Sequence, residues 1–297
     1  MVTQTLYFSN PTYLKVKNNQ LHIHIKTEVN EKEITRPIED IGVVILDNNQ
    51  ITITHQAIRA LQENKVVIIS CGANRMPHSI TLPIEGHTEQ SERYKKQIAA
   101  SVPLKKKLWQ QTIEAKVYNQ MRVLQKLGKP AKRLQVLLKR VQSGDPDNIE
   151  GQAAAYYWKT LIEDFKRDRY GEPPNNLLNY GYAIIRAMVA RALVSSGLLP
   201  TLGIHHKNKY NAFCLADDIM EPYRPFMDLI VYNMFVNNKL ESFLSTESKR
   251  HLLSIGEVDG KFGKRISPLM VGMSRTTSTL YQCISGEKRK IIYPKIE

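Results

Sequence analysis

One acidic side chain stands out in the segment that runs from residue 145 to residue 165. Asp145-Pro146, followed by Asp147 or Asn148 as a cap, is typical of a helix start. At helical spacing, Glu150 shares a face with Ala154, Tyr157, Trp158, Leu161 and Phe165. A carboxylate that continues an apolar stripe must be capped, paired or bound to a metal ion, because an isolated buried charge is very costly. The alternative is a first-turn acid that interacts with the helix dipole.

A second group of candidates lies further along the chain. His205 and His206 are adjacent, and Asp217, Asp218 and Glu221 follow within sixteen residues. Neighbouring strand residues face opposite sides, so at most one of the two histidines is expected to be a ligand. On a helix, Asp218 and Glu221 occupy positions i and i+3, which lets both carboxylates address one centre.

Two prolines interrupt the helix that carries these acids. In a regular helix, the Pro222 ring would clash with the carbonyl of Asp218, and the Pro225 ring with that of Glu221. We therefore expect the helix to bend at the acidic pair. The alternative is a capped surface helix whose acids are solvated. Arg224, between the two prolines, could pair with a phosphate or with Glu221.

Together, Glu150, one histidine and one or two further carboxylates would form a hard, oxygen-rich site with one imidazole. This composition suits Mg²⁺ or Mn²⁺ better than a closed zinc site, and the imidazole favours Mn²⁺. In a basic protein, such a centre indicates metal-assisted phosphoryl transfer on nucleic acid.

The charge of the chain is unevenly distributed. Its 297 residues include 42 Lys and Arg and 28 Asp and Glu, a net charge of +14. Residues 1–90 carry 8 basic and 9 acidic side chains, a net of −1, so residues 91–297 carry +15. An excess this large predicts a polyanionic partner. We expect a cytoplasmic protein with no membrane partner, because we find neither a membrane-length apolar run nor a secretory signal, and the three cysteines are widely separated.

Two kinds of periodicity divide the chain. Short runs dominated by β-branched residues, in part alternating, a turn at Asn18–Asn19 and one helix near 55–64 predict a small sandwich in the first 85 residues. The expected strands are 13–16, 21–25, 34–38, 42–46, 51–54, 66–70 and 77–84. Helical spacing follows from about residue 89. Helices are expected near 90–127, 130–142, 147–169, 176–196, 214–236 and 246–255. The predicted fold class is α+β: a small β-sandwich domain (1–85), a linker (86–92) and a larger, basic, all-α domain (93–297).

Three long motifs make the sequence recognisable. They are NIEGQAAAYYW, LLNYGYAIIRAMVARALVSSGLLPTLGIHHKN and FCLADDIMEPYRPFMD, in this order. The chain resembles the CRISPR-associated spacer-acquisition integrase and endonuclease, the larger and catalytic adaptation subunit, in its type II form. The resemblance covers nearly the whole chain.

The resemblance implies a divalent metal site in the helical domain. Its ligands correspond to Glu150 in IEGQ, His206 as the second histidine of GIHH, and Glu221 in DIMEP. Asp218 matches an acidic position often counted with the catalytic site. The implied cofactor is Mg²⁺ or Mn²⁺, and the implied reaction is attack of a DNA 3′-OH on phosphodiesters of the repeat array.

The resemblance also implies partners. The chain would form a homodimer through its β-rich domain, and two dimers would flank a dimer of the smaller acquisition subunit in a heterohexamer. This complex would bind a short spacer-precursor duplex and the repeat array. In type II systems, the effector nuclease and an accessory acquisition protein also take part.

Two other hypotheses compete with this one. The chain could be a stand-alone metal-dependent nuclease or a mobile-element integrase with the same catalytic domain. It could also be a non-catalytic nucleic-acid-binding scaffold whose acids only cap helices.

The charge distribution predicts strongly salt-dependent binding to duplex DNA, because residues 91–297 would release counterions from the phosphates. If about six phosphates are neutralised, the logarithm of the binding constant should fall against the logarithm of the salt concentration with a slope of about −5. A filter-binding titration at several salt concentrations measures this slope. A slope near zero would contradict the assignment of DNA binding to the basic region.

Overall fold

The computed structural model describes residues 4–26, 31–168, 171–237 and 244–297. The chain divides into two compact units, residues 1–86 and residues 87–297. We refer to them as the N-terminal unit and the helical unit. The predicted fold class, β-rich and then helical, is confirmed.

Two four-stranded sheets form the N-terminal unit. One has the order β1-β5-β7-β8 and the other β4-β3-β2-β6. The strands are β1 (Gln4–Phe8), β2 (Thr12–Lys17), β3 (Gln20–Lys26), β4 (Glu31–Pro37), β5 (Ile41–Leu46), β6 (Thr52–Ile53), β7 (Val67–Cys71) and β8 (Pro77–Thr81), with helix α1 (His55–Glu63). Apolar side chains of both sheets and of α1 share one core. The alternating pattern predicted these strands except β1.

The hairpin between β2 and β3 turns where the sequence predicts it. Asn18 and Asn19 both have positive φ, 51° and 56°, and Lys17 pairs with Gln20. Positive φ at both central residues is the requirement of the type I′ turn that fits the twist of paired strands. This turn fixes the register of β3, so that alternate β3 side chains face outward.

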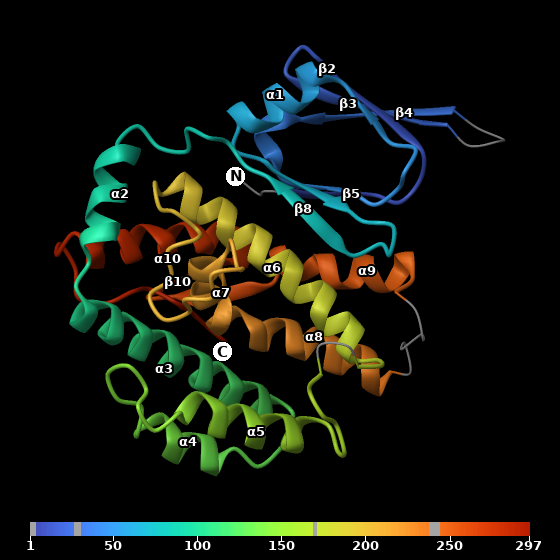
Figure 1. Cartoon of the computed structure of the whole chain (residues 1–297). Helices are drawn as coiled ribbons and strands as arrows, with labels where there is room; N and C mark the ends of the chain where they lie inside the picture. Colours follow the sequence, from blue (N-terminus) through green and yellow to red (C-terminus); the bar gives the residue numbers. More distant parts are fainter. Residues whose placement is uncertain (1–3, 27–30, 169–170, 238–243) are drawn as a thin grey trace. The chain divides into compact units, whose positions relative to one another are not determined.

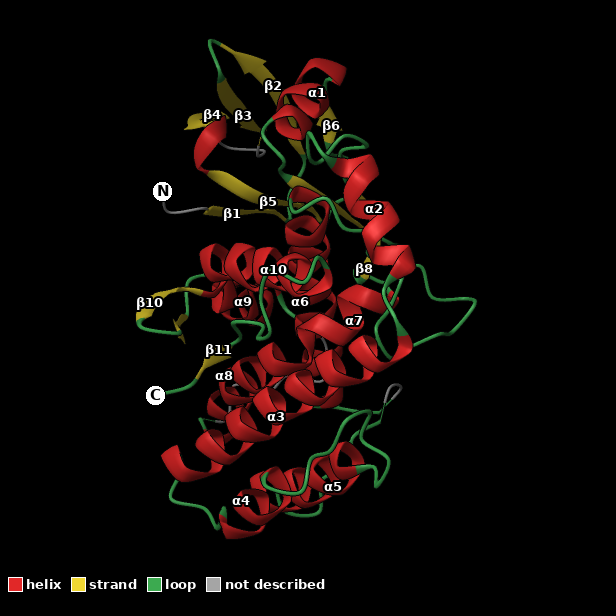
Figure 2. Cartoon of the chain, turned by 90° about the vertical axis from the view of Figure 1, so that its left-hand side faces the viewer, coloured by secondary structure: helices red, strands yellow, loops and turns green. Residues whose placement is uncertain are grey.

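The helical unit contains α2 to α10 and a small sheet. Its helices are α2 (Gln90–Ala99), α3 (Val102–Lys126), α4 (Lys132–Leu138), α5 (Ile149–Leu161), α6 (Asn175–Ser195), α7 (Cys214–Met220), α8 (Arg224–Val236), α9 (Thr246–Leu253) and α10 (Leu269–Ile284). Short 3₁₀ turns η2 (Glu221–Tyr223) and η3 (Ser254–Gly256) follow α7 and α9, and η1 (Ile38–Asp40) lies in the N-terminal unit. Figures 1 and 2 show α4 and α5 on one side of α3, and α7 and α8 on the other.

Three details of this unit differ from the sequence analysis. The segment expected to be one helix near 90–127 is two, because Ser101 caps a new helix and Pro103 lies in its first turn. Helix α5 ends at Leu161, earlier than expected, and residue 169 of that segment lies outside the described residues. The unit is also not entirely α-helical.

Beyond residue 255, helix α10 and three strands were not predicted from the sequence. The strands β9 (Asp259–Phe262), β10 (Arg265–Pro268) and β11 (Pro294–Lys295) form an antiparallel sheet of order β10-β9-β11. Each has at most four residues, which is too few for alternation to appear against the neighbouring sequence.

Helix α6 is long and apolar enough to cross a membrane by length and composition alone, but 78% of its apolar window is buried inside the structure. Packing within the helical unit therefore accounts for its composition.

Asn119 on α3 ties three segments of the helical unit together. Its amide nitrogen donates to the carbonyls of Pro222 (2.8 Å) and Pro294 (3.0 Å), and its amide oxygen accepts from the N–H of Ile296 (3.1 Å). The side chain is fully buried. Asn119 thus anchors both the η2 turn and the C-terminal strand to α3.

Replacing Asn119 with alanine should lower the free energy of unfolding by roughly 2–4 kcal/mol, since each buried polar group left without a partner costs about 1–3 kcal/mol. Urea denaturation of the full chain measures this loss. Gln125→Ala is the matched control, because Gln125 lies on the same helix and is exposed. Equal effects of the two substitutions would show that Asn119 does not anchor these segments.

Candidate metal centre and its polar surroundings

Glu150 lies in the first turn of α5, where other side chains accept hydrogen bonds from the free backbone N–H groups. Asn148 caps the helix by accepting from the N–H of Gly151, and Asp145 accepts from the N–H groups of Ile149 (2.8 Å) and Glu150 (2.9 Å). Of the two caps predicted as alternatives, Asp147 and Asn148, the structure shows Asn148. Because these N–H groups already have acceptors, the Glu150 carboxylate is available for another partner.

That partner is Lys116 on α3. The Lys116 ammonium lies 2.6 Å from Glu150 Oε1 and 2.6 Å from Glu221 Oε2. The Glu221 side chain is only 5% exposed, against 24% for Glu150. Two carboxylates from distant parts of the chain thus converge on one cation position.

Glu221 begins the η2 turn, where the two prolines interrupt the helical path between α7 and α8. This confirms the predicted bend at the acidic pair. Arg224, one turn further on, places its Nε 2.8 Å from Glu221 Oε1. Of the two roles considered for Arg224, the structure shows the ion pair with Glu221.

The charges of this cluster shift one another's pKa values. Burial alone would raise the pKa of Glu221, but Arg224 and Lys116 hold it below its usual value. Burial would likewise lower the pKa of Lys116, but Glu221 and Glu150 raise it above its usual value. The cluster is therefore a charged network at neutral pH.

Asp218 contacts the loop that carries the two histidines. Its buried carboxylate accepts from the N–H groups of Ile204 (2.7 Å), His205 (2.9 Å) and His206 (3.2 Å). It also lies 2.5 Å from His206 Nδ1. A side chain at Gly203 would collide with this carboxylate and with the His206 carbonyl. Asp218 therefore positions the GIHH loop.

The bond to Asp218 orients the His206 ring. A carboxylate at Nδ1 fixes the proton there and leaves Nε2 as the nitrogen for a further ligand. This hydrogen bond raises the pKa of His206 against the opposing effect of burial, and Glu221 and Glu150 raise it further. The His206 side chain is 44% exposed, so the ring is accessible from outside.

His205 has a different environment. Its ring stacks on Trp109, with centroids 4.1 Å apart and an interplanar angle of 2°. Trp109 is buried in α3, two turns before Lys116. The His205 ring therefore contacts Trp109, while the hydrogen bonds to Asp218 hold the backbone of the loop. Asp217, the other acid of this segment, pairs with Arg186 (2.6 Å) and accepts from Asn211 (2.7 Å).

A cavity of about 210 Å³ adjoins Glu221. Lys116, Arg167 and Arg224 contribute three positive charges to its lining, beside Glu221 and Asp228. Tyr182 hydrogen-bonds Asp228, and Arg224 lies over the Tyr182 ring at 4.5 Å. Burial raises the pKa of Asp228 to about 7.

Sequence reasoning missed Lys116, Arg167 and Asp228. A signal for Lys116 was available, because it continues the buried face of α3 at four-residue spacing from Thr112 to Gln120. A lysine on such a face needs carboxylate partners. Arg167 lies in a loop after the end of α5, although helical spacing assigned its segment to a helix.

Comparison with known proteins identifies relatives of this chain. The family described as "CRISPR associated protein Cas1" matches residues 6–257. The CRISPR-associated endonuclease Cas1 of Neisseria meningitidis serogroup C (strain 8013) is 38% identical over 256 residues, covering 85% of this chain and 83% of that relative. Both matches are sequence similarities that extend over most of the chain.

Two solved structures share the fold. A casposase bound to integration product superposes with a TM-score of 0.82 at 22% identity, over 100% of this chain and 95% of that chain. A chain of a Cas6-RT-Cas1–Cas2 complex has a TM-score of 0.75 at 18% identity, over 100% of this chain and 36% of that one.

Replacing Lys116 with methionine should destabilise the metal-free chain by about 3–5 kcal/mol at pH 7, because it leaves Glu221 buried without one of its two cations. The lowered pKa of Glu221 stabilises the fold above the ordinary glutamate pKa, and this contribution is lost as the pH falls through the folded value. The raised pKa of Lys116 stabilises the fold at every pH below the ordinary lysine pKa. This contribution is lost only in strong alkali. The penalty of Lys116→Met should therefore shrink from pH 7 to pH 4.

Urea denaturation at the two pH values in the presence of a chelator measures this difference. Lys126→Met, an exposed position on the same helix, is the control. A penalty that does not change with pH would exclude the ion pair as its cause.

Proposed function

This chain belongs to the Cas1 family of CRISPR-associated proteins, and from that membership we propose that it is a divalent-metal-dependent DNA endonuclease and integrase of CRISPR adaptation. It inserts short duplex DNA into a repeat array by attack of a 3′-OH on a phosphodiester. The observation that carries this proposal is the convergence of Glu150 and Glu221 on one cation position. The hydrogen bond to Asp218 raises the pKa of His206, and the charges of the two converging glutamates raise it further.

The donor set fits Mg²⁺ or Mn²⁺. Two carboxylates and one imidazole are ligands that Mn²⁺ takes readily and Mg²⁺ accepts. The ammonium of Lys116 already occupies a position where two carboxylates favour positive charge. Glu150, His206 and Glu221 would hold the ion, which would polarise the phosphodiester and stabilise the alkoxides that form and leave.

The chain's own side chains complete the site. Asp218 accepts the hydrogen of His206 Nδ1, which leaves Nε2 available as a ligand. Arg224 and Arg167 border the adjoining cavity, where guanidinium groups suit the geometry of a phosphate. Lys116 would move from between the carboxylates and remain close enough to neutralise a phosphate oxygen. The excess of +15 in residues 91–297 binds the DNA backbone without reading its sequence.

The partners follow from the family and its relatives. One similar structure is a chain of a Cas6-RT-Cas1–Cas2 complex, and another is a casposase bound to integration product. We propose that this chain binds DNA, forms a homodimer through the N-terminal unit and assembles with Cas2 into a heterohexamer in the cytoplasm. The effector nuclease and an accessory acquisition protein of type II systems are further proposed partners.

Alanine at Glu150, His206 or Glu221 should each reduce strand transfer by more than about 100-fold, because ligands of one ion act as a unit and their losses are not additive. Duplex binding should remain almost unchanged, since it comes from many Lys and Arg side chains. The assay is transfer of a labelled 3′-OH duplex into a supercoiled plasmid, in Mg²⁺, Mn²⁺ or chelator, with Cas2 present.

Two substitutions serve as matched controls. His205→Ala should keep most of the transfer activity and lose only the stacking on Trp109, about 0.5–1.5 kcal/mol of stability. Asp147→Ala removes an exposed acid near Glu150. Asp218→Ala should reduce strand transfer because it releases the loop that carries His206. Asp218→Asn should restore part of this activity. Near-native transfer by two of the three ligand variants would overturn the proposed site.

A plasmid without the repeat tests the biological role. Transfer that requires the repeat supports CRISPR adaptation, whereas equal transfer into both plasmids would favour a mobile-element integrase.

A further inference from the structure

A second group of metal-binding side chains lies on the outer face of the N-terminal unit. Strand β3 alternates, so that Leu21 and Ile23 enter the core while His22 and His24 point to the other side of the sheet. The neighbouring strand β4 places Glu33 directly opposite His24. Two imidazoles and one carboxylate therefore share one face of a hairpin.

These three side chains are close enough to share one ion. Glu33 Oε1 lies 2.7 Å from His22 Nδ1 and 3.2 Å from His24 Nε2. One ligand atom from each residue lies within 4.8 Å of the other two. Ligand atoms that each lie about 2.0–2.2 Å from a tetrahedral zinc ion are about 3.3–3.6 Å apart, so small side-chain movements would bring these three atoms into position.

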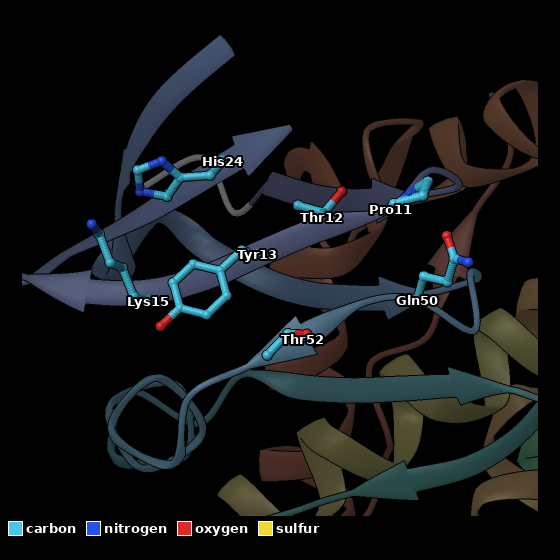
Figure 3. Close-up of a pocket in the computed structure, with 7 residues that line it drawn as sticks. All are labelled: Pro11, Thr12, Tyr13, Lys15, His24, Gln50 and Thr52. Atoms are coloured by element: carbon cyan, nitrogen blue, oxygen red, sulfur yellow. The ribbon is translucent and has the colours of Figure 1, made fainter. Parts of the chain in front are cut away.

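The two histidines are well covered for residues on an outer face. Their side chains are 18% and 23% exposed. His24 borders a groove of about 400 Å³, and Figure 3 shows its ring beside the side chains of Tyr13 and Lys15. The carboxylate of Glu33 is about half exposed, so an ion could enter from that side.

One nitrogen in this group has no hydrogen bond. His24 Nε2 is shielded from solvent, and among the residues that the structure describes it finds no hydrogen-bond partner, although Glu33 Oε1 is near. A buried polar atom without a partner costs free energy and calls for an explanation such as a bound ion. His22, by contrast, hydrogen-bonds Glu33 through Nδ1.

We propose that His22, His24 and Glu33 bind a divalent transition-metal ion of the Zn²⁺ class, with a fourth position open to water. Imidazole favours Zn²⁺ and its neighbours in the first transition row over Mg²⁺. Two imidazoles and a carboxylate with one open position are an established zinc ligand set. The ion would link β3 to β4 and satisfy the unpartnered His24 nitrogen.

Lys15 sets a limit on the affinity. It lies opposite His22 on strand β2, and its charge acts on Glu33. The hydrogen bond with His22 lowers the pKa of Glu33, which keeps the carboxylate ionised. Removing the Lys15 charge should tighten metal binding, because it removes a like charge from the neighbourhood of the ion.

The experiment uses the full chain with His206→Ala, which removes the imidazole from the other centre, and Co²⁺ as a spectroscopic probe. We expect one equivalent of Co²⁺ with the intense visible absorption of a low-coordinate, nitrogen-ligated ion, displaced by Zn²⁺. Adding His24→Gln or Glu33→Gln should abolish this absorption or weaken binding by at least about tenfold. Adding Lys15→Gln should tighten it a few-fold.

His55→Gln, which replaces an exposed histidine on α1 of the same unit, is the matched control and should bind as the His206→Ala chain does. Melting curves in chelator verify that every variant is folded. Unchanged Co²⁺ affinity and absorption after His24→Gln would overturn the proposal. The absence of a saturable equivalent in the His206→Ala chain would also overturn it.

Discussion

The ion pairs of the Lys116 ammonium with Glu150 and Glu221 are the interaction on which the helical unit depends. Each carboxylate lies 2.6 Å from the same nitrogen, and Glu221 is almost fully buried. Two like charges held this close need a cation between them, because their repulsion is strong where water is excluded. The fold must therefore bring α3, α5 and the η2 turn to one point, and the structure around that point can be understood as the means of doing so.

A separate local interaction holds each of those three segments in place. Asn148 and Asp145 take up the first N–H groups of α5, which leaves Glu150 free. Pro222 and Pro225 end one helical path and start another, so that Glu221 lies at the junction. Asn119, close to Lys116 on α3, binds the Pro222 carbonyl that this break exposes. The polar groups released by a broken helix are thus reused to attach the break to α3.

Local patterns were enough to predict much of this from the sequence. Alternation and helical spacing predicted most strands and helices, the Asn18–Asn19 turn, and a helix cap at Asp147 or Asn148. They also predicted the bend at Glu221, because proline acts on its own neighbours. What they could not show is which distant side chains meet. Lys116 and Arg167 reach the site only through tertiary packing. The orientation of Asp218 toward the GIHH loop likewise depends on a contact across twelve or more residues.

The two histidine-containing clusters differ in the ions they suit, and the difference follows from their donors. Glu150 and Glu221 supply hard oxygen atoms beside one imidazole, within a network that already holds Lys116 and Arg224. His22 and His24 supply two imidazoles to one carboxylate, with Lys15 as the neighbouring charge. Oxygen-rich sites accept Mg²⁺ or Mn²⁺, whereas nitrogen-rich sites select ions of the zinc class. Donor chemistry therefore favours a different kind of ion in each of the two units.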